Sequence, residues 1–227
     1  MKEVVDFLRR LHDRNERAWF EAHRTEWLHL QERFHAFAGG LIEGIASFDP
    51  SVAGLTVRDC TYRIYRDVRF SRDKSPYKTW QGIFVAPHGK KAGYAGYYFH
   101  LEGTPGEGPQ GGHLLFAGLH LPHPTVLRSV REEILDNGAE FAANVRRAKG
   151  FALDESHMLR RTPAGFPSDT PYDALLRLKE VALCRSFDDA FLAGDDLLER
   201  TLAEFRKTAP FVQQLNRAVQ YAYEEMM

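Results

Sequence analysis

Residues 61–78 read TYRIYRDVRFSRDKSPYK, and at this stretch the sequence pattern has changed from helical to strand-like. After Asp49 and Pro50 the chain consists of short runs rich in aromatic and branched residues, separated by Gly and Pro. Such runs are typical of strands joined by turns, so we expect strands near residues 59–70, 81–87, 94–101 and 113–121. The loop EGTPGEGPQGG separates the last two and predicts a long hairpin connection in a largely antiparallel sheet.

Helical patterns lie on both sides of the predicted strands. A long helix is expected over residues 26–48, because apolar side chains recur there every three or four positions. A short first helix and a segment that follows Asn15 are expected ahead of it. Pro124 predicts the start of another helix, with a second one after Gly138, and two further helices are expected over residues 196–207 and 210–225. Helices, then sheet, then helices indicate an α+β fold, and no linker divides residues 1–227 into two domains.

The overall composition is that of an ordinary soluble globular protein. The chain has 227 residues, 44% of them hydrophobic and 27% charged, with a net charge of -1. This balance argues against a protein that coats nucleic acid, because such proteins are usually basic. Two distant cysteines, Cys60 and Cys184, predict neither a disulfide framework nor a metal-binding pair. No signal peptide or membrane span is expected, so the sequence predicts a cytoplasmic protein with no membrane partner.

Residues 61–78 also hold the strongest local excess of charge, with six basic side chains and two acidic ones. Guanidinium groups present paired donors that suit carboxylate or phosphate groups, so such a cluster needs internal acids or a bound anion. The hydroxyls and cations near Pro76 add groups that loops commonly present to ligands. The predicted ligand-binding residues from this stretch are Arg63, Tyr65, Arg66, Arg69, Arg72, Lys74, Tyr77 and Lys78.

Two questions about this cluster stay open at the level of sequence. The arginines could instead form a structural network with Asp67, Asp73 or a distant acid. If the protein is an enzyme, Asp67 and Asp73 are the candidate catalytic groups, acting as general acid or base or orienting an arginine. Arg160 and Arg161 join the cluster only if their proline-rich segment folds towards it.

Other patterns carry weaker signals. Gly106, Gly108 and Gly111 satisfy G-x-G-x-x-G, but a strand rather than a helix is expected next, so we predict no nucleotide cofactor and no other cofactor. His100 and His113 bracket this loop, yet no carboxylate or cysteine completes a known ligand spacing, so we predict no metal site. The acid pairs Asp188-Asp189 and Asp195-Asp196 lie at expected helix starts, where we favour capping over catalysis.

The segment YRIYRDVRFSRDKSPYKT, together with three others, resembles the DUF2461 family. The element Asn15, Arg17, Trp19 and Phe20 is similar to that family's N-x-R-x-W-F, residues 121–131 to its proline-then-helix segment, and LRRTPAGF to its L-K-R-x-P-K-G-Y. The chain departs from the family pattern at Trp80, Ala164 and Thr170. The resemblance implies a single-domain α+β fold in a soluble intracellular protein, and it implies no particular activity.

From the sequence we therefore expect an intracellular protein that binds a small phosphate- or carboxylate-bearing ligand through the basic stretch. The first alternative is a module that docks on nucleic acid or on an acidic protein, which should show a flat basic face with accessible aromatics. The second is an arginine network with a purely structural role. Substrate, reaction and oligomeric state cannot be derived from the sequence.

Overall fold

The computed structural model describes residues 1–104, 106 and 111–226. Three helices begin the chain: α1 (Lys2–Asp13), α2 (Arg17–Ala22) and α3 (Arg24–Ala46). Their bounds confirm the expected N-terminal helices to within a few residues. The buried side chains of α3 keep the predicted spacing of three or four, and they are Trp27, Leu30, Phe34, Ala38, Leu41, Ile42 and Ile45.

A five-stranded antiparallel sheet follows, in the order β1-β2-β3-β5-β4. Its strands are β1 (Trp80–Val85), β2 (Gly96–Glu102), β3 (His113–Leu119), β4 (Ala152–Leu153) and β5 (Val181–Phe187). The first three confirm three of the four expected strands. With helices on both sides of the sheet in sequence, the fold is α+β, as predicted.

The expected strand over residues 59–70 is wrong. This part of the chain contains the short helix α4 (Val57–Cys60), the isolated bridges Thr61↔Ile83 and Tyr65↔Tyr77, and otherwise irregular backbone. One cause lies in Asp67 and, on the returning side of the loop, Asp73, whose side chains accept hydrogen bonds from the backbone amides two residues further on, at 3.3 and 2.9 Å. Backbone amides that donate to nearby side chains cannot also donate to a neighbouring strand, so the segment forms a wide loop instead.

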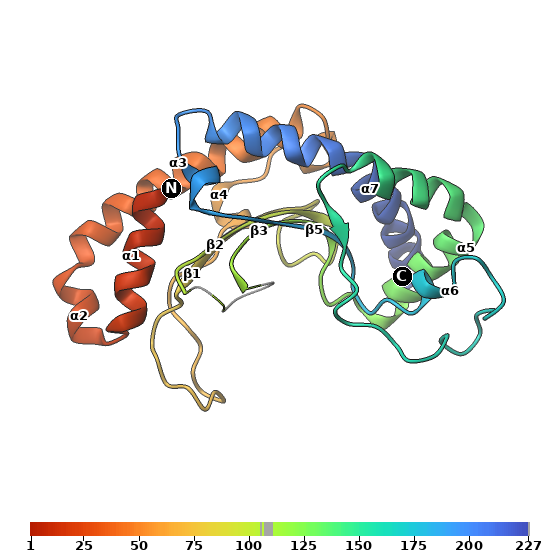
Figure 1. Cartoon of the computed structure of the whole chain (residues 1–227), viewed down its shortest axis with the longest axis horizontal. Coiled ribbons are helices and arrows are strands. Elements are labelled where there is room, and N and C mark those ends of the chain that lie inside the picture. The colour runs from red at the N-terminus through yellow and green to blue at the C-terminus, as the bar shows by residue number, and fades with distance from the viewer. Residues whose placement is uncertain (105, 107–110, 227) are drawn as a thin grey trace.

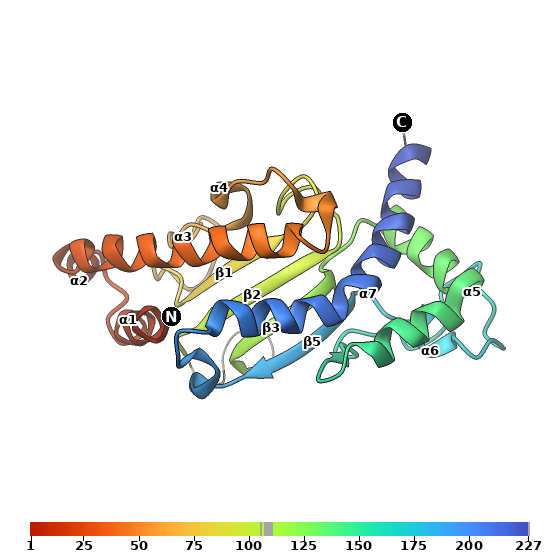
Figure 2. The same ribbon diagram turned by 90° about the horizontal axis from the view of Figure 1, so that it is seen from above.

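Two helices were each predicted as a pair. The helix α5 (Pro124–Arg147) runs on past Gly138, with non-helical dihedral angles at Asn137. The helix α7 (Leu197–Glu225) contains Pro210 in its interior and bends along its length (Figure 2). Proline removes one backbone donor and bends a helix, but the flanking turns continue where the apolar face stays buried.

The short elements complete the chain: η1 (Pro50–Val52), α6 (Asp173–Leu176) and η3 (Asp189–Leu192). The pattern of Gly106, Gly108 and Gly111 lies partly outside the described residues. The next element after it is strand β3, as the sequence predicts.

Helices α3 and α7 pack on one face of the sheet, and no helix in the described part of the chain covers the other face (Figure 1). The core lies between these layers, where Phe37 of α3 contacts Phe99 and Phe205 of α7 contacts Tyr97, at ring-centroid distances of 5.1 and 5.6 Å. Residues 61–78 project from one end of the sheet, and residues 154–172 lie at the opposite end of the molecule (Figure 1). No described helix combines the length and the apolar character that crossing a membrane requires.

Candidate functional site

Tyr77 fixes the projecting segment 61–78 to the N-terminal part of the chain through hydrogen bonds and ring stacking. The side-chain amide of Asn15 donates to the carbonyl oxygen of Tyr77 at 2.9 Å and accepts from its backbone amide at 3.1 Å. The ring of Tyr77 stacks on Phe20 of α2, with centroids 4.1 Å apart and an angle of 19° between the planes. Tyr77 is therefore buried, and the base of the loop has a defined position against α2.

A hollow of about 320 Å³ lies between α2 and this segment. Arg17, at the first position of α2, and Arg66, in the projecting segment, both line it. Its remaining lining residues are Glu21, Tyr65, Val68, Pro76 and Tyr77. Arg66 makes an ion pair with Asp73 and donates to the Ser71 hydroxyl at 3.3 Å, whereas Arg17 makes no ion pair within the described residues.

A second hollow, of about 210 Å³, lies on the other side of Tyr65, which lines both. Its charged groups are Arg63 from the segment and Arg24 from α3. Arg24 pairs with Glu21 at 3.1 Å, and this hydrogen bond raises the pKa of its guanidinium. Its remaining lining residues are Phe20, Trp27, Leu28, Gln31 and Ile64.

Together the two hollows hold an excess of positive charge. They are lined by four arginines and one glutamate, an excess of three positive charges, or two once Asp73 beside Arg66 is counted. We refer to them jointly as the basic hollows. Arginine stays protonated at any accessible pH, so this excess is permanent.

The other cations of the predicted cluster do not converge on the basic hollows. Arg69 pairs with Asp67 at 2.6 Å and its side chain is 77% exposed, and Arg72 is exposed in the same loop. The ammonium of Lys74 donates to the Val68 carbonyl at 3.0 Å, and that of Lys78 to the Arg63 carbonyl at 2.9 Å. Arg160 and Arg161 are not buried and belong to the segment at the opposite end of the molecule (Figure 1).

Asp67 and Asp73 are partners of arginines in this geometry. The Arg69 guanidinium lowers the pKa of Asp67, and the Ser75 hydroxyl and amide, followed by Arg66, lower the pKa of Asp73. A carboxyl group with a lowered pKa is ionised at neutral pH and has no proton to donate. Of the two roles that the sequence leaves open for them, orienting an arginine fits this arrangement better.

Sequence reasoning missed Arg17 and Arg24 as lining residues of a site. Both are exposed residues of short or polar helical stretches, where charged side chains are ordinary. The one signal in the sequence was Asn15, whose side chain fixes the segment 61–78 beside α2.

Comparison with known proteins points to one family. A family model described as "Conserved hypothetical protein (DUF2461)" matches residues 3–213. The chain belongs to the DUF2461 family. No curated protein and no solved structure is significantly similar to it. The segments of this DUF2461 protein that resemble the family most clearly, residues 15–20 and 62–79, are the ones that meet at the basic hollows.

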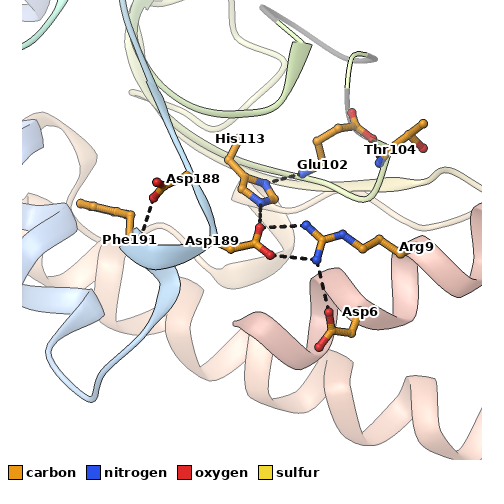
Figure 3. Close-up of polar contacts among 8 residues, drawn as sticks. All are labelled: Asp6, Arg9, Glu102, Thr104, His113, Asp188, Asp189 and Phe191. Carbon is orange, nitrogen blue, oxygen red and sulfur yellow. Dashed lines mark hydrogen bonds and ion pairs between the residues drawn. The ribbon is translucent and has the colours of Figure 1, made fainter.

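A second polar cluster of the DUF2461 protein joins α1, η3 and the sheet (Figure 3). Arg9 binds both carboxylate oxygens of Asp189 at 2.8 Å, and one of these oxygens lies 3.1 Å from Nε2 of His113. The backbone amide of Glu102 donates to Nδ1 of His113 at 2.9 Å. Since Nδ1 accepts this hydrogen bond, His113 is neutral and its Nε2–H donates to Asp189.

The expected capping role of the acid pair 188–189 is confirmed for one residue only. Asp188 accepts from the Phe191 amide at 3.1 Å and so caps η3, while Asp189 forms the cluster with Arg9 and His113 (Figure 3). The histidines His100 and His113 are hydrogen-bonded to carboxylates of the protein.

We expect this cluster to make stability depend on pH in two ranges. Burial lowers the pKa of His113. Below about pH 6.5 the unfolded chain therefore binds a proton more readily than the folded protein does, and the free energy of unfolding decreases as the pH is lowered. The Arg9 guanidinium lowers the pKa of Asp189 to about 2, so its contribution is present above the ordinary value of 3.8 and is lost as the pH falls from there towards 2.

Urea unfolding of wild type, His113→Gln and Asp189→Asn between about pH 7.5 and 2.5 measures both effects. His113→Gln should flatten the decline between about pH 6.5 and 5, and Asp189→Asn the decline below about pH 4. His35, whose pKa is also lowered by burial, leaves part of the upper decline in every variant. Unchanged slopes in both variants would contradict the assignment of these groups.

Proposed function

We propose that this protein binds a small anionic ligand, bearing phosphate or carboxylate groups, in the basic hollows. The observation that carries the proposal is that Arg17 and Arg66 line one hollow from two different elements, α2 and the projecting segment. Two guanidinium groups converging on one concave site suit planar or tetrahedral anions better than dispersed surface cations do.

The aromatic lining supports a small organic ligand rather than a bare ion. Tyr65 is 45% exposed and lies between the two hollows, and its ring packs 5.4 Å from Tyr77 and 6.1 Å from Phe20. Ligand pockets are typically about 300 to 1,000 Å³, so the larger hollow, at about 320 Å³, suits a ligand of metabolite size. An anionic group between the arginines would place the rest of the ligand against Tyr65.

We expect Arg17→Ala to weaken binding of such a ligand about 10- to 100-fold, the loss that corresponds to roughly 1.5 to 3 kcal/mol for a hydrogen bond to a charged group. A thermal-shift panel of phosphorylated and carboxylated metabolites identifies a ligand, and calorimetry of wild type and variants gives the affinities. Arg17 is the sharper target because it makes no ion pair within the described residues, so removing it leaves no protein acid without a partner.

Arg72→Ala is the matched control, since Arg72 is exposed in the same loop outside both hollows. Its affinity should equal that of wild type. Equal losses in Arg17→Ala and Arg72→Ala would mean that only the general charge of the loop attracts the anion. If Arg66→Ala lowers the melting temperature and no anion of the panel binds wild type, a purely structural role of the arginines replaces the proposal.

One observation favours the second candidate, a module that docks on nucleic acid. Phe70 is 97% exposed and lies near the exposed cations Arg69, Arg72 and Lys74 of the loop. Exposed aromatics beside cations are suited to base stacking and phosphate contact. Oligonucleotide binding that weakens steeply with salt and is lost in Phe70→Ala, with Arg17→Ala unaffected, would favour this candidate.

We also infer a cytoplasmic location. The sequence has two cysteines, Cys60 and Cys184, far apart along the chain, and so no disulfide framework, which is common in reducing compartments. Fractionation of cells that produce the tagged full chain tests this inference, and recovery outside the cytosol would contradict it.

A further inference from the structure

The face of the sheet that no described helix covers carries a hydrogen-bonded chain of three side chains from one strand. In β2, Phe99 contacts α3 and Tyr97 contacts α7, so the alternate residues Tyr98, His100 and Glu102 point to the opposite face. The Tyr98 hydroxyl lies 2.8 Å from Nδ1 of His100, and Nε2 of His100 lies 3.2 Å from Oε2 of Glu102.

Glu102 places one ring proton of His100 on Nε2, because a carboxylate only accepts hydrogen bonds. In the neutral ring, Nδ1 then carries no proton and accepts the hydrogen bond from the Tyr98 hydroxyl. A neutral imidazole therefore directs its basic nitrogen at a hydroxyl while a carboxylate orients it from the far side, which is the arrangement of a hydroxyl nucleophile, a general base and an orienting acid.

Glu102 is held in place from three directions. Its Oε1 accepts from the Thr104 amide at 3.1 Å, its Oε2 meets His100, and its own backbone amide donates to His113. His113 is in turn held by Asp189, whose carboxylate Arg9 binds (Figure 3). The carboxylate is thus pre-positioned, which is what an orienting group requires.

Stability alone is a weak explanation for this chain. The side chains of His100 and Glu102 are 1% and 2% exposed, and taking a carboxylate out of water has a desolvation penalty that apolar side chains of similar size would avoid. The neighbouring strand β1 also leaves room for the Tyr98 ring. A Cβ atom at Gly82 would lie 2.5 Å from the Tyr98 hydroxyl, so only glycine at this position lets the ring lie where it does.

Two cations lie over Tyr62, an aromatic ring that packs on Tyr98. Tyr62 packs 6.4 Å from the Tyr98 ring, and the ammonium groups of Lys78 and Lys90 lie 5.5 and 5.8 Å from the centre of the Tyr62 ring. A substrate reaching Tyr98 therefore meets aromatic rings and positive charge.

We propose that Tyr98 is a nucleophilic hydroxyl, that His100 is its general base and Glu102 its positioning residue, and that the site takes an acyl ester carrying a negative charge. In the step, the Tyr98 oxygen forms a bond to the acyl carbon and its proton passes to Nδ1 of His100. The bond from the acyl carbon to the ester oxygen breaks, and His100 returns the proton to the departing alkoxide. Atoms and charge balance without any further reactant, and the site is independent of the basic hollows.

Aryl sulfonyl fluorides test this chemistry on the full-length protein. Tyrosine oxygen displaces fluoride from sulfur, its proton passes to a base, and the stable product is located by peptide mass spectrometry. We expect Tyr98 to be labelled faster than Tyr221, which is 53% exposed and serves as the reference in the same sample. 4-(Fluorosulfonyl)benzoic acid should label Tyr98 faster than the uncharged benzenesulfonyl fluoride does, and equal rates would overturn the charged substrate class.

Variants separate chemistry from folding. Tyr98→Phe removes only the hydroxyl and should abolish labelling at this position, while Tyr221→Phe should leave it unchanged. His100→Gln should slow labelling of Tyr98 about a hundredfold, the lower range for loss of a general base. Glu102→Gln should shift the ring proton of His100, read from its ¹⁵N chemical shifts. The two carboxylate oxygens accept from different groups, so the NH₂ of Gln would face either His100 or the Thr104 amide.

The outcomes that overturn the proposal are equally defined. If Tyr98 of the wild-type protein is labelled no faster than Tyr221, the proposal is overturned. This comparison uses wild type alone and so does not depend on the folding of any variant. A rate in folded His100→Gln equal to that of wild type would also overturn the proposal, with folding checked by melting temperature.

Discussion

Replacing Gly118 with alanine is expected to lower the free energy of unfolding by roughly 4 kcal/mol or more. Gly118 lies inside β3, opposite Gly96 on one side and Ala182 on the other. Its φ angle is +142°, a conformation that L side chains rarely adopt. A Cβ atom there would lie 2.3 Å from the Val181 carbonyl oxygen and 2.7 Å from the Ala182 Cα, so the backbone of β5 would have to shift.

Gly112→Ala is the matched control, because Gly112 immediately precedes β3 and no atom of the described residues lies within 4 Å of the position that its Cβ atom would take. Its stability should stay within about 0.5 kcal/mol of wild type, as for most surface substitutions. Urea unfolding of both variants measures the difference. A loss in Gly118→Ala no larger than in Gly112→Ala would mean that β3 and β5 separate at little energetic penalty.

The sequence predicted the fold well where one physical signal dominated. The apolar spacing of α3 led directly to its buried face, because a long amphipathic helix must bury that face against the sheet. Strand β5 has no comparable signal. It follows a proline-rich connection, and its pairing with β3 joins residues far apart along the chain, such as Leu119 and Val181, which local patterns do not record.

Residues that disrupt regular structure were harder to interpret. Pro210 and Gly138 suggested helix ends, yet α7 and α5 continue past them. Buried residues on both sides of Pro210, including Phe205 and Phe211, keep α7 against the core. Tertiary packing thus outweighs the unfavourable free energy of about 3 kcal/mol, relative to alanine, of placing proline in a helix interior.

The candidate site was predictable only in part. Arg63 and Arg66 were recognised from charge density alone, and both line the basic hollows. Arg17 and Arg24 could not be added, because their place depends on how Asn15 fixes the loop beside α2. Charge density also could not separate converging arginines from Arg69, which its own neighbour Asp67 neutralises.

The projecting segment borders both proposed sites. Tyr62 packs against Trp80 and Tyr98 on the face of the sheet that no described helix covers, whereas Arg63 lines a basic hollow on the side of α3. Consecutive residues of an extended chain point in opposite directions, so one stretch can serve two surfaces. Lys78 bonds the Arg63 carbonyl and lies over the Tyr62 ring, and burial followed by the charge of Arg63 lowers the pKa of its ammonium.

The arginine with the clearest structural role lies elsewhere, on α5. Arg131 is 9% exposed, and its guanidinium donates to the carbonyl oxygens of Leu176 and Leu178 at 2.7 and 2.9 Å. These carbonyls lie at and just beyond the end of α6, where backbone acceptors lack helical partners. No carboxylate of the described residues forms an ion pair with Arg131, and burial lowers the pKa of its guanidinium.

Arg131→Ala should therefore lower the free energy of unfolding by about 3 kcal/mol, since it leaves two buried carbonyls without donors and removes a packed side chain. Arg128→Ala, on the same helix, is the control. Arg128 is 74% exposed and pairs with Glu132 on the helix surface, so its loss should change stability by no more than about 0.5 kcal/mol. Chemical unfolding compares the two, and hydrogen exchange at the amides of α6 locates the damage. Equal stability of the two variants would show that water can replace the Arg131 guanidinium at these carbonyls, and that α6 is held to α5 by its apolar contacts alone.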